Sequence, residues 1–274
     1  MIIGITGGKG GTGKTVLAVN LAVALAKEGH DVAYVDCDAD CPSSHIVANA
    51  ELKNKKEVRS FLPEFIEEKC RHCRKCVELC EFNALYQLKG KQPTLVNSLC
   101  SGCAACMIAC PFNAIKESSK VIGWTHTAEK YGVTFFSGEL KPSEPLSEKI
   151  VDSVKQRALS KKHEIMIIDT AAGAHCQVVC ALQGCDNAVA VTEPTLFGEH
   201  DLKVISDVLK KLGIPYKTVV NRSTLSKKKI ESALQIPYDK VMVECYIEGI
   251  PIVEKYPVHP ISKKISLFAK RLIK

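Results

Sequence analysis

A glycine-rich segment near the N-terminus constrains the fold of this chain more than any other feature. It runs from Gly7 to Thr15, between an apolar run at residues 2–6 and a segment at residues 15–28 with helical spacing of its apolar residues. Glycines let the backbone curl until successive N–H groups point at one anion, and the start of a helix adds a positive dipole end. The order strand, glycine loop, helix predicts the first unit of an α/β fold.

Residues 8–15 of this loop fit the phosphate-binding pattern G-x4-G-K-T. In that pattern Lys14 meets the β- and γ-phosphates of a nucleotide, and Thr15 offers its hydroxyl to Mg²⁺. A glycine-rich turn without a ligand is the alternative, but the flanking strand and helix occur where phosphate binding needs them. The predicted nucleotide-binding residues of the loop are Gly8, Lys9, Gly10, Gly11, Thr12, Gly13, Lys14 and Thr15.

The rest of the chain alternates between short apolar runs and segments with helical spacing. After a second strand at residues 32–35, we expect strands at 133–136, 165–169, 188–192, 216–220 and 241–245. We expect helices at residues 143–160, 177–183, 198–212, 226–234 and 261–273. This alternation predicts an α/β protein with a doubly wound, mostly parallel sheet.

Cysteine is unusually frequent, with 14 in 274 residues, and eight of them lie between Cys70 and Cys110. Residues 70–84 and 100–114 share the pattern C-x2-C-x2-C-x3-C-x-F-N-A, offset by 30 residues throughout, which indicates an internal duplication. The N-terminal residues contain no export signal, so we expect a cytoplasmic protein. In that reducing compartment, clustered cysteines indicate metal binding rather than disulfides.

The spacing in each half is that of bacterial ferredoxins, in which three cysteines of one run hold one [4Fe-4S] cluster and the fourth holds the other. The first cluster is therefore predicted at Cys70, Cys73, Cys76 and Cys110. The second cluster is predicted at Cys100, Cys103, Cys106 and Cys80. Zinc is the alternative metal, but its sites use two separated C-x2-C pairs, which four cysteines in one run fit poorly.

The formal net charge is +7 with every cysteine counted as neutral. Thiolates that ligate two clusters would lower this excess, so we expect no nucleic-acid partner. The longest apolar stretch, residues 16–26, is broken by Asn20 and is too short to span a bilayer.

Lys9 narrows the interpretation of the glycine loop. The run Lys-Gly-Gly-Thr-Gly-Lys-Thr at residues 9–15 resembles the deviant Walker A motif of the MinD/ParA/nitrogenase iron-protein group of P-loop ATPases. In that group the first lysine reaches the phosphates of the opposite subunit in an ATP-bound dimer. The resemblance implies that Lys9 and Lys14 are catalytic, that ATP or ADP binds with Mg²⁺, and that the protein forms a homodimer.

Carboxylates follow two of the expected strands, at the edge where open α/β sheets bind ligands. The resemblance implies that Asp38 activates the attacking water and that Asp36 lies near Mg²⁺, with Asp40 as a competitor for the first role. A helix cap or a solvated turn is the alternative for each of these residues. Asp169, at the end of residues 165–169, resembles the Walker B aspartate that holds Mg²⁺ through water.

Two later segments also resemble loops of this group. Residues 170–173 resemble switch II, with Ala172 where the group commonly has proline, and Gly173 is the implied sensor of the γ-phosphate through its N–H. Asn221 and Arg222 follow a strand at the position where an asparagine reads the base, so ATP is favoured over GTP.

Nearly the whole chain resembles MinD-superfamily P-loop ATPases that carry an inserted ferredoxin domain. The resemblance implies a discontinuous P-loop ATPase domain at residues 1–60 and 119–274. Residues 61–118 would then form an inserted α+β module of the bacterial ferredoxin type with two [4Fe-4S] clusters. Residues 193–195 resemble a loop of close relatives, to which we assign no chemistry.

The leading hypothesis is a Mg²⁺-dependent ATPase whose nucleotide cycle drives electron transfer through two clusters to a redox partner. One alternative is an ATPase that assembles or carries iron–sulfur clusters or metallocofactors, with Cys176 as a candidate ligand of a further cluster. Another is a MinD-like positioning ATPase that binds membranes through the basic amphipathic segment 261–273. The same pattern describes a helix that covers a sheet, which we favour.

Overall fold

The computed structural model describes all 274 residues of the chain, which divide into two compact units. The first unit contains Met1–Lys56, Trp124–Glu139 and Ser147–Lys274, and the second contains Glu57–Gly123 and Leu140–Leu146. The cysteine-rich segment 61–118 lies within the second unit.

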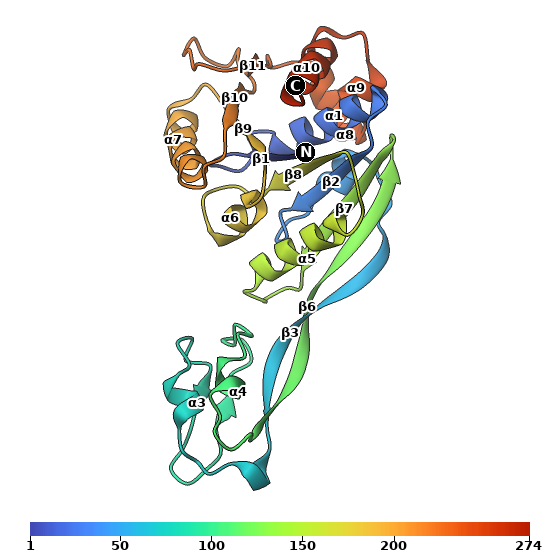
Figure 1. The fold of residues 1–274 in the computed structure, drawn as a ribbon. Helices are drawn as coiled ribbons and strands as arrows, with labels where there is room; N and C mark the ends of the chain where they lie inside the picture. Colours follow the sequence, from blue (N-terminus) through green and yellow to red (C-terminus); the bar gives the residue numbers. More distant parts are fainter. The chain divides into compact units, whose positions relative to one another are not determined.

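A mostly parallel sheet forms the centre of the first unit (Figure 1), as the alternation of strands and helices predicts. Its strands lie in the order β11-β10-β9-β1-β8-β2-β7, and each neighbouring pair is parallel. Their bounds are β1 Ile2–Thr6, β2 Val32–Cys37, β7 Val133–Leu140, β8 Ile165–Thr170, β9 Asn187–Thr192, β10 Tyr216–Val220 and β11 Leu234–Gln235. Because the strands are parallel, the loops after their carboxyl ends meet at one edge of the sheet.

Helices cover both faces of this sheet, as right-handed crossovers between parallel strands require. One layer contains α1 (Lys14–Lys27), α9 (Ile252–Lys255) and α10 (Pro260–Leu272), which contact one another. The other layer contains α5 (Ser147–Leu159), α6 (Cys176–Leu182) and α7 (Leu196–Lys211). Helix α1 is buried along most of its length, in keeping with its run of alanine, leucine and valine.

Helix α10 uses its apolar face in the core of the first unit. Ile261, Ile265, Phe268 and Leu272 are all buried there, while the basic residues between them are exposed. The interpretation of this segment as a helix that covers the sheet is therefore confirmed. No helix in the structure is both long and apolar enough to cross a bilayer.

Two of the expected elements are wrong. Residues 241–245, expected as a strand, lie in helix α8 (Lys240–Glu248), which begins where the Asp239 carboxylate caps the Val241 N–H at 2.8 Å and ends at the left-handed Gly249. Residues 226–234, expected as a helix, form no helix and end at β11, because the Ala233 N–H donates to Thr218 of β10. A short helix α2 (Ser44–Val47) follows β2.

The second unit contains short elements in two similar halves. Helix α3 (Lys75–Glu78) belongs to the first half and α4 (Ala105–Ile108) to the second, and the two contact each other. A 3-10 turn at Glu67–Lys69 precedes them, and β4 (Leu85–Tyr86) pairs antiparallel with β5 (Thr94–Leu95).

The sequence did not predict two long strands, β3 (Lys53–Phe65) and β6 (Ile115–Lys130), which run along the chain from one unit into the other. They continue the sheet in the order β7-β6-β3. The first half of β3 is charged and exposed, so it lacks the alternation of apolar and polar residues that marks a strand.

Candidate nucleotide site and cysteine cavities

The glycine loop, residues 7–13, joins β1 to α1 at the carboxyl edge of the sheet. Two of its glycines have left-handed backbones, with φ of +78° at Gly11 and +90° at Gly13. A Cβ at Gly8 would collide with the backbone oxygen of Asp201, so only glycine fits there. The loop therefore needs its glycines both for conformation and for close packing.

Lys14 is buried at the start of α1, and Thr15 follows it, half-buried. The Lys14 Nζ donates to the carbonyl oxygen of Lys9 at 3.2 Å. Burial lowers the pKa of Lys14, while the charges of Asp169 and Asp38 oppose that effect. The ammonium group is thus removed from water inside the loop, where a phosphate would compensate its charge.

Asp36 on β2 and Asp169 on β8 lie directly opposite each other on neighbouring strands, and both are buried. The Tyr34 hydroxyl donates to Asp169 Oδ2 at 2.8 Å. Burial raises the pKa of Asp169 to about 7, the charge of Asp36 adds to this effect, and the charge of Lys14 opposes it. Burial also raises the pKa of Asp36, against the hydrogen bonds that backbone N–H groups donate to it.

This pair of acids has the chemistry of a magnesium site. Asp169 Oδ1 and Thr12 Oγ1 are buried without hydrogen-bond partners. Mg²⁺ takes oxygen ligands from one or two carboxylates together with water and substrate phosphates. Thr15, Asp36 and Asp169 therefore fit a Mg²⁺ that would arrive with the nucleotide, and their roles as ligands stay predictions.

The structure distinguishes Asp38 from Asp40. Asp38 Oδ1 accepts from the Cys41 N–H at 3.3 Å, and burial raises the pKa of this half-buried carboxyl. Asp40 is exposed, and its Oδ2 accepts from Gln177 Nε2 of α6 at 2.8 Å. The charge of Asp38 also raises the pKa of Lys14, and the role of Asp38 toward the attacking water stays a prediction.

Gly173, the predicted γ-phosphate sensor, follows β8 with a φ of +98°. Its N–H donates to the carbonyl oxygen of Gly7 at 3.1 Å, which joins the switch II segment to the glycine loop. Ala172 lies in the same bend, so the turn forms without the proline that the group commonly has. To bind a γ-phosphate, the Gly173 N–H would have to exchange its bond to Gly7.

Two cavities in the second unit are each lined by cysteines from both halves of the duplication. The cysteines of the first cavity are Cys70, Cys73, Cys76 and Cys110. Those of the second cavity are Cys80, Cys100, Cys103 and Cys106. The first has a volume of about 20 Å³ and the second about 310 Å³. The metal itself stays a prediction, since no three His, Cys, Asp or Glu side chains are gathered in a position to hold an ion.

The backbone around the cysteines repeats between the two halves. His72 and Arg74 have φ of +56° and +65°, and the residues 30 positions later have +67° and +61°. Alternation of left- and right-handed residues turns successive N–H groups toward one point, in the nests that bind anions, including iron–sulfur clusters. Burial raises the pKa of Cys76 and Cys106 to about 11, so without metal both thiols keep their protons at neutral pH.

The family described as the CobQ/CobB/MinD/ParA nucleotide binding domain matches residues 3–254. The chain belongs to this family. It is a nucleotide-binding ATPase of the MinD/ParA type, as the glycine loop and Lys9 predict.

Proteins similar to this chain come from archaea and bacteria. An uncharacterized protein of Methanocaldococcus jannaschii is 40% identical over 91% of this chain and 90% of its own length. An uncharacterized ATP-binding protein of the same archaeon is 29% identical over 99% and 87%. The septum site-determining protein MinD of Pyrococcus horikoshii, solved with Mg-ADP, has a TM-score of 0.64 at 22% identity over 100% of this chain and 96% of its own. The iron-sulfur cluster carrier protein of Escherichia coli matches only 18% of this chain and 14% of its own length, at 50% identity.

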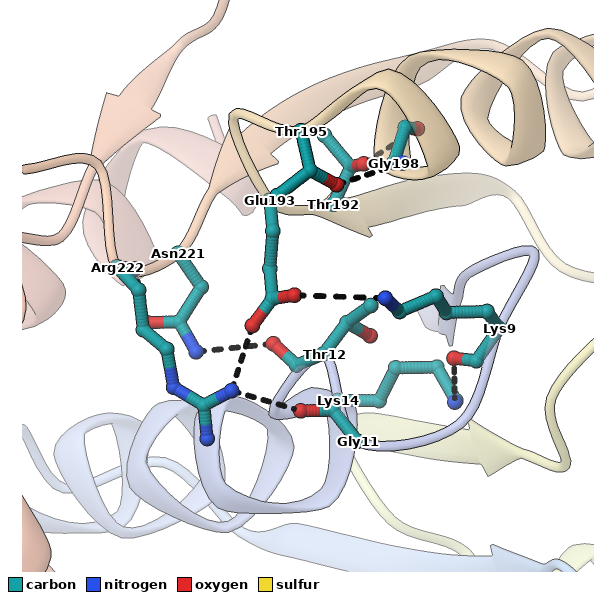
Figure 2. A network of polar contacts seen from close by, with 10 residues as sticks. All are labelled: Lys9, Gly11, Thr12, Lys14, Thr192, Glu193, Thr195, Gly198, Asn221 and Arg222. Carbon is teal, nitrogen blue, oxygen red and sulfur yellow. Dashed lines mark hydrogen bonds and ion pairs between the residues drawn. The ribbon is translucent and has the colours of Figure 1, made fainter. Parts of the chain in front are cut away.

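A buried carboxylate that the sequence left without a role, Glu193, links the loops of this ATPase (Figure 2). Its Oε1 lies 2.6 Å from Arg222 Nη1, and its Oε2 lies 3.7 Å from Lys9 Nζ. Arg222 also donates to the Gly11 carbonyl at 3.2 Å, and Asn221 Nδ2 donates to the Thr12 carbonyl at 2.9 Å.

Glu193 thus joins the loop after β9 to the glycine loop and to the loop after β10. The side chains of Asn221 and Arg222 reach the same glycine loop, so these candidate base-reading residues lie beside it. The available sequence signal was the position of Glu193, a charged residue directly after a buried strand at the ligand edge of the sheet.

The raised pKa of Asp169 predicts a pH dependence of stability in the protein without nucleotide and Mg²⁺. The folded pKa of about 7 exceeds the ordinary value of 3.8, so the folded state holds this proton more tightly than the unfolded chain. Stability from this group is therefore lost as the pH rises from near 4 to near 7. We expect Asp169→Asn to raise the Tm by about 5 °C near pH 8 and by clearly less near pH 5.

Thermal unfolding in a chelating buffer measures this difference. The matched control is Asp186→Asn, which changes a carboxylate at the opposite, amino end of the same sheet, where it accepts from the Ile2 N–H. An Asp169→Asn effect of equal size at both pH values would contradict the raised pKa.

Proposed function

We propose that this MinD/ParA-type ATPase couples an ATP-dependent dimer switch to electron transfer through two [4Fe-4S] clusters. The observation that carries the proposal is that one chain contains two features. One is the carboxyl edge of the sheet with the glycine loop and the buried acids Asp36 and Asp169, here called the nucleotide edge. The other is a pair of cavities lined by four thiols each. Clusters of this kind, when bound, take up and release single electrons. A nucleotide switch on the same chain would give that transfer a means of control.

The nucleotide edge supports hydrolysis as well as binding. We assign Lys14 to neutralising charge on the transferred phosphate, and Asp36 and Asp169 to holding a Mg²⁺ that, when bound, would stabilise the charge of the phosphates. We assign Asp38 to orienting the attacking water, because it lies beside Lys14 and is not held by α6. Asn221 and Arg222 flank the glycine loop and are assigned to the nucleoside.

Lys9 supports the homodimer. Its ammonium group lies 3.7 Å from Glu193 and its side chain is 38% exposed, so this is a loose ion pair. Pairs of this kind are worth roughly 1 kcal/mol or less, and Lys9 can leave at little cost. Glu193 remains paired with Arg222 at 2.6 Å when Lys9 moves. We therefore assign Lys9 to the phosphates of a second copy of the chain in the ATP-bound state.

The donor sets of the two cavities fit [4Fe-4S] clusters better than zinc. Each set contains three cysteines from one run and a fourth from the other run. Cys110 lies 30 or more residues after the other three cysteines of its set, and Cys80 lies 20 residues before the nearest cysteine of its set. Clusters of the bacterial ferredoxin type are held in this crossed way. The positive-φ residues between the cysteines add backbone N–H groups that suit an anionic cluster.

Redox titration of the anaerobically purified protein tests the proposal. The midpoint potentials of the clusters, followed by EPR, are expected to differ between samples with MgATP and samples with MgADP. The physical reason is that dimer closure changes the solvent and charges around a cluster, which set its potential. Identical potentials with MgATP, with MgADP and without nucleotide would argue against coupling.

A second candidate function is the delivery of iron–sulfur clusters to other proteins. The short match to the Escherichia coli carrier protein favours it, and Cys176 is exposed at the start of α6, just after the switch II segment. Iron analysis of the wild type and Cys176→Ala separates the two candidates. If the wild type and Cys176→Ala both contain about eight irons per chain, two four-iron clusters account for all of the iron. The protein would then carry no further cluster for delivery.

Membrane positioning, the third hypothesis, has less support. The apolar residues of α10 that would enter a bilayer are already buried against the sheet and α1. Exposing them would cost the core of the first unit about 1.5–3 kcal/mol for each large side chain.

A further inference from the structure

We infer that the first cavity docks an acidic one-electron carrier protein and that the second cavity does not. The first cavity is the one lined by Cys70, Cys73, Cys76 and Cys110. This inference rests on the proposed function, because it names the partner of one cluster site. It comes from a difference between two halves that are otherwise alike in cysteine spacing and backbone conformation.

The difference is one of charge. The residues between the cysteines of the first half that line the first cavity are Arg71, His72, Arg74 and Lys75, here called the basic collar. The residues 30 positions later are Ser101, Gly102, Ala104 and Ala105. No carboxylate lines the first cavity, whereas Glu81 is the one charged residue that lines the second.

The basic collar faces solvent and is not required for packing. All four collar residues are exposed, whereas their counterparts in the second half are half-buried. Arg71 and Lys75 make no ion pair, and Arg74 makes only a long one, 4.0 Å to Glu78, besides a hydrogen bond to the Gln87 carbonyl at 3.3 Å. The charge of the collar is therefore available to an approaching molecule.

Backbone conformation does not explain the collar either. His72 has φ of +56° and Arg74 has +65°, a region that side chains adopt at a cost. In the second half, Gly102 and Ala104 adopt the same left-handed conformation, with φ of +67° and +61°. Because small neutral residues suit these two positions, the turn does not require the side chains of His72 and Arg74.

An acidic carrier protein is the partner that fits this surface. A positive patch raises the rate of encounter with an anionic partner by about 10-fold to 1000-fold, and the effect falls with salt. Phe112, which lines the same cavity and is 43% exposed, adds an apolar contact inside the charged rim. Three cationic side chains are fewer than the roughly 6–10 phosphate contacts of a typical nucleic-acid site.

Each encounter would move one electron. When the carrier donates, it would lose one electron, and a cluster held by the four cysteines of the first cavity would gain it. When the carrier accepts, the two changes are reversed. No other reactant is needed.

The test compares two outer-sphere oxidants of opposite charge on the dithionite-reduced holoprotein, without nucleotide. The probes are the hexacyanoferrate(III) anion and the tris(phenanthroline)cobalt(III) cation. The variant Arg71→Ser/Arg74→Ala/Lys75→Ala gives three of the four collar positions the residues of the second half and leaves His72 unchanged. At low salt, oxidation by the anion is expected to slow by about 10-fold in this variant, and oxidation by the cation is expected not to slow.

Two further variants keep the test decisive. Arg71→Lys/Arg74→Lys retains the charge and is expected to keep the wild-type rate. Lys89→Gln/Lys91→Gln removes two exposed lysines of the same unit that line neither cavity and is also expected to keep it. A second readout is the midpoint potential, which is expected to fall at one cluster only in the triple variant, because cations stabilise the more negative reduced state.

Equal rates and an unchanged potential in the triple variant and the wild type would overturn the inference. So would a slower reaction with both probes, because that is loss of structure rather than of charge. Wild-type binding to duplex DNA or anionic vesicles, with unchanged probe rates in the triple variant, would assign the collar to a different partner and overturn it too. If the proposed function is wrong, the measurements differ from these: the purified protein contains no iron, or the midpoint potentials of its clusters do not change with nucleotide.

Discussion

Replacing Lys14 with methionine is expected to lower the rate of ATP hydrolysis by about 100-fold or more and to weaken ATP binding at least about tenfold. Lys14 is the residue predicted to meet the phosphates, and burial in the loop has already removed its charge from water. Methionine fills a similar volume without the charge. ATPase assays and nucleotide titration on the purified variant measure both effects.

The matched control is Lys27→Met, at the other end of the same helix, where Lys27 is 40% exposed and pairs with Glu254 at 2.8 Å. This control should retain full activity. Thermal unfolding should show that Lys14→Met is no less stable than the wild type, since a dehydrated charge has been replaced by an apolar side chain. A Lys14→Met variant that stays folded and hydrolyses ATP at the wild-type rate would contradict the assignment of the site.

Replacing Cys80 with alanine is expected to remove the second cluster although Cys80 belongs to the first cysteine run. The reason is that Cys80 lines the second cavity, with three cysteines of the other run. Iron content should fall from about eight to about four per chain, because one of two four-iron clusters loses a thiolate. Iron and sulfide analysis of anaerobically prepared variants, with EPR of the reduced state, measures the loss.

The EPR spectra identify which cluster remains. Cys80→Ala and Cys106→Ala should leave the same residual signal, since both line the second cavity. Cys110→Ala and Cys76→Ala should leave the other signal, since both line the first. If Cys80→Ala instead matched Cys76→Ala, each run would hold its own cluster, and the crossed arrangement would be wrong.

The parts of the fold that the sequence predicted are those encoded by local pattern. The segment from β1 through the glycine loop to α1 has glycines at positions where only glycine fits, such as Gly8. The duplication of the cysteine runs could also be recognised from the sequence, because a fixed spacing repeats with an offset of 30 residues. The acids Asp36 and Asp169 follow from buried strands that end at one edge of a parallel sheet.

The parts that the sequence did not predict depend on tertiary context. The apolar run at 241–245 is rich in valine and suits a strand, but a cap at Asp239 and a left-handed Gly249 make it helix α8. Strands β3 and β6 lack an alternating pattern where they are exposed. Glu193 gains its partners only when loops nearly 200 residues apart meet at the sheet edge, which local pattern does not encode.

The central claim is that nucleotide state controls electron transfer through the clusters of the same chain. Stopped-flow mixing of the reduced holoprotein with an outer-sphere acceptor, in the presence of MgATP, MgADP or no nucleotide, tests it most directly. Coupling between sites is typically worth about 1–3 kcal/mol, so we expect rates that differ by about fivefold or more between MgATP and MgADP. The difference should disappear in Lys14→Met. Equal rates in all three conditions, with ATP shown to be bound and both clusters present, would contradict the account.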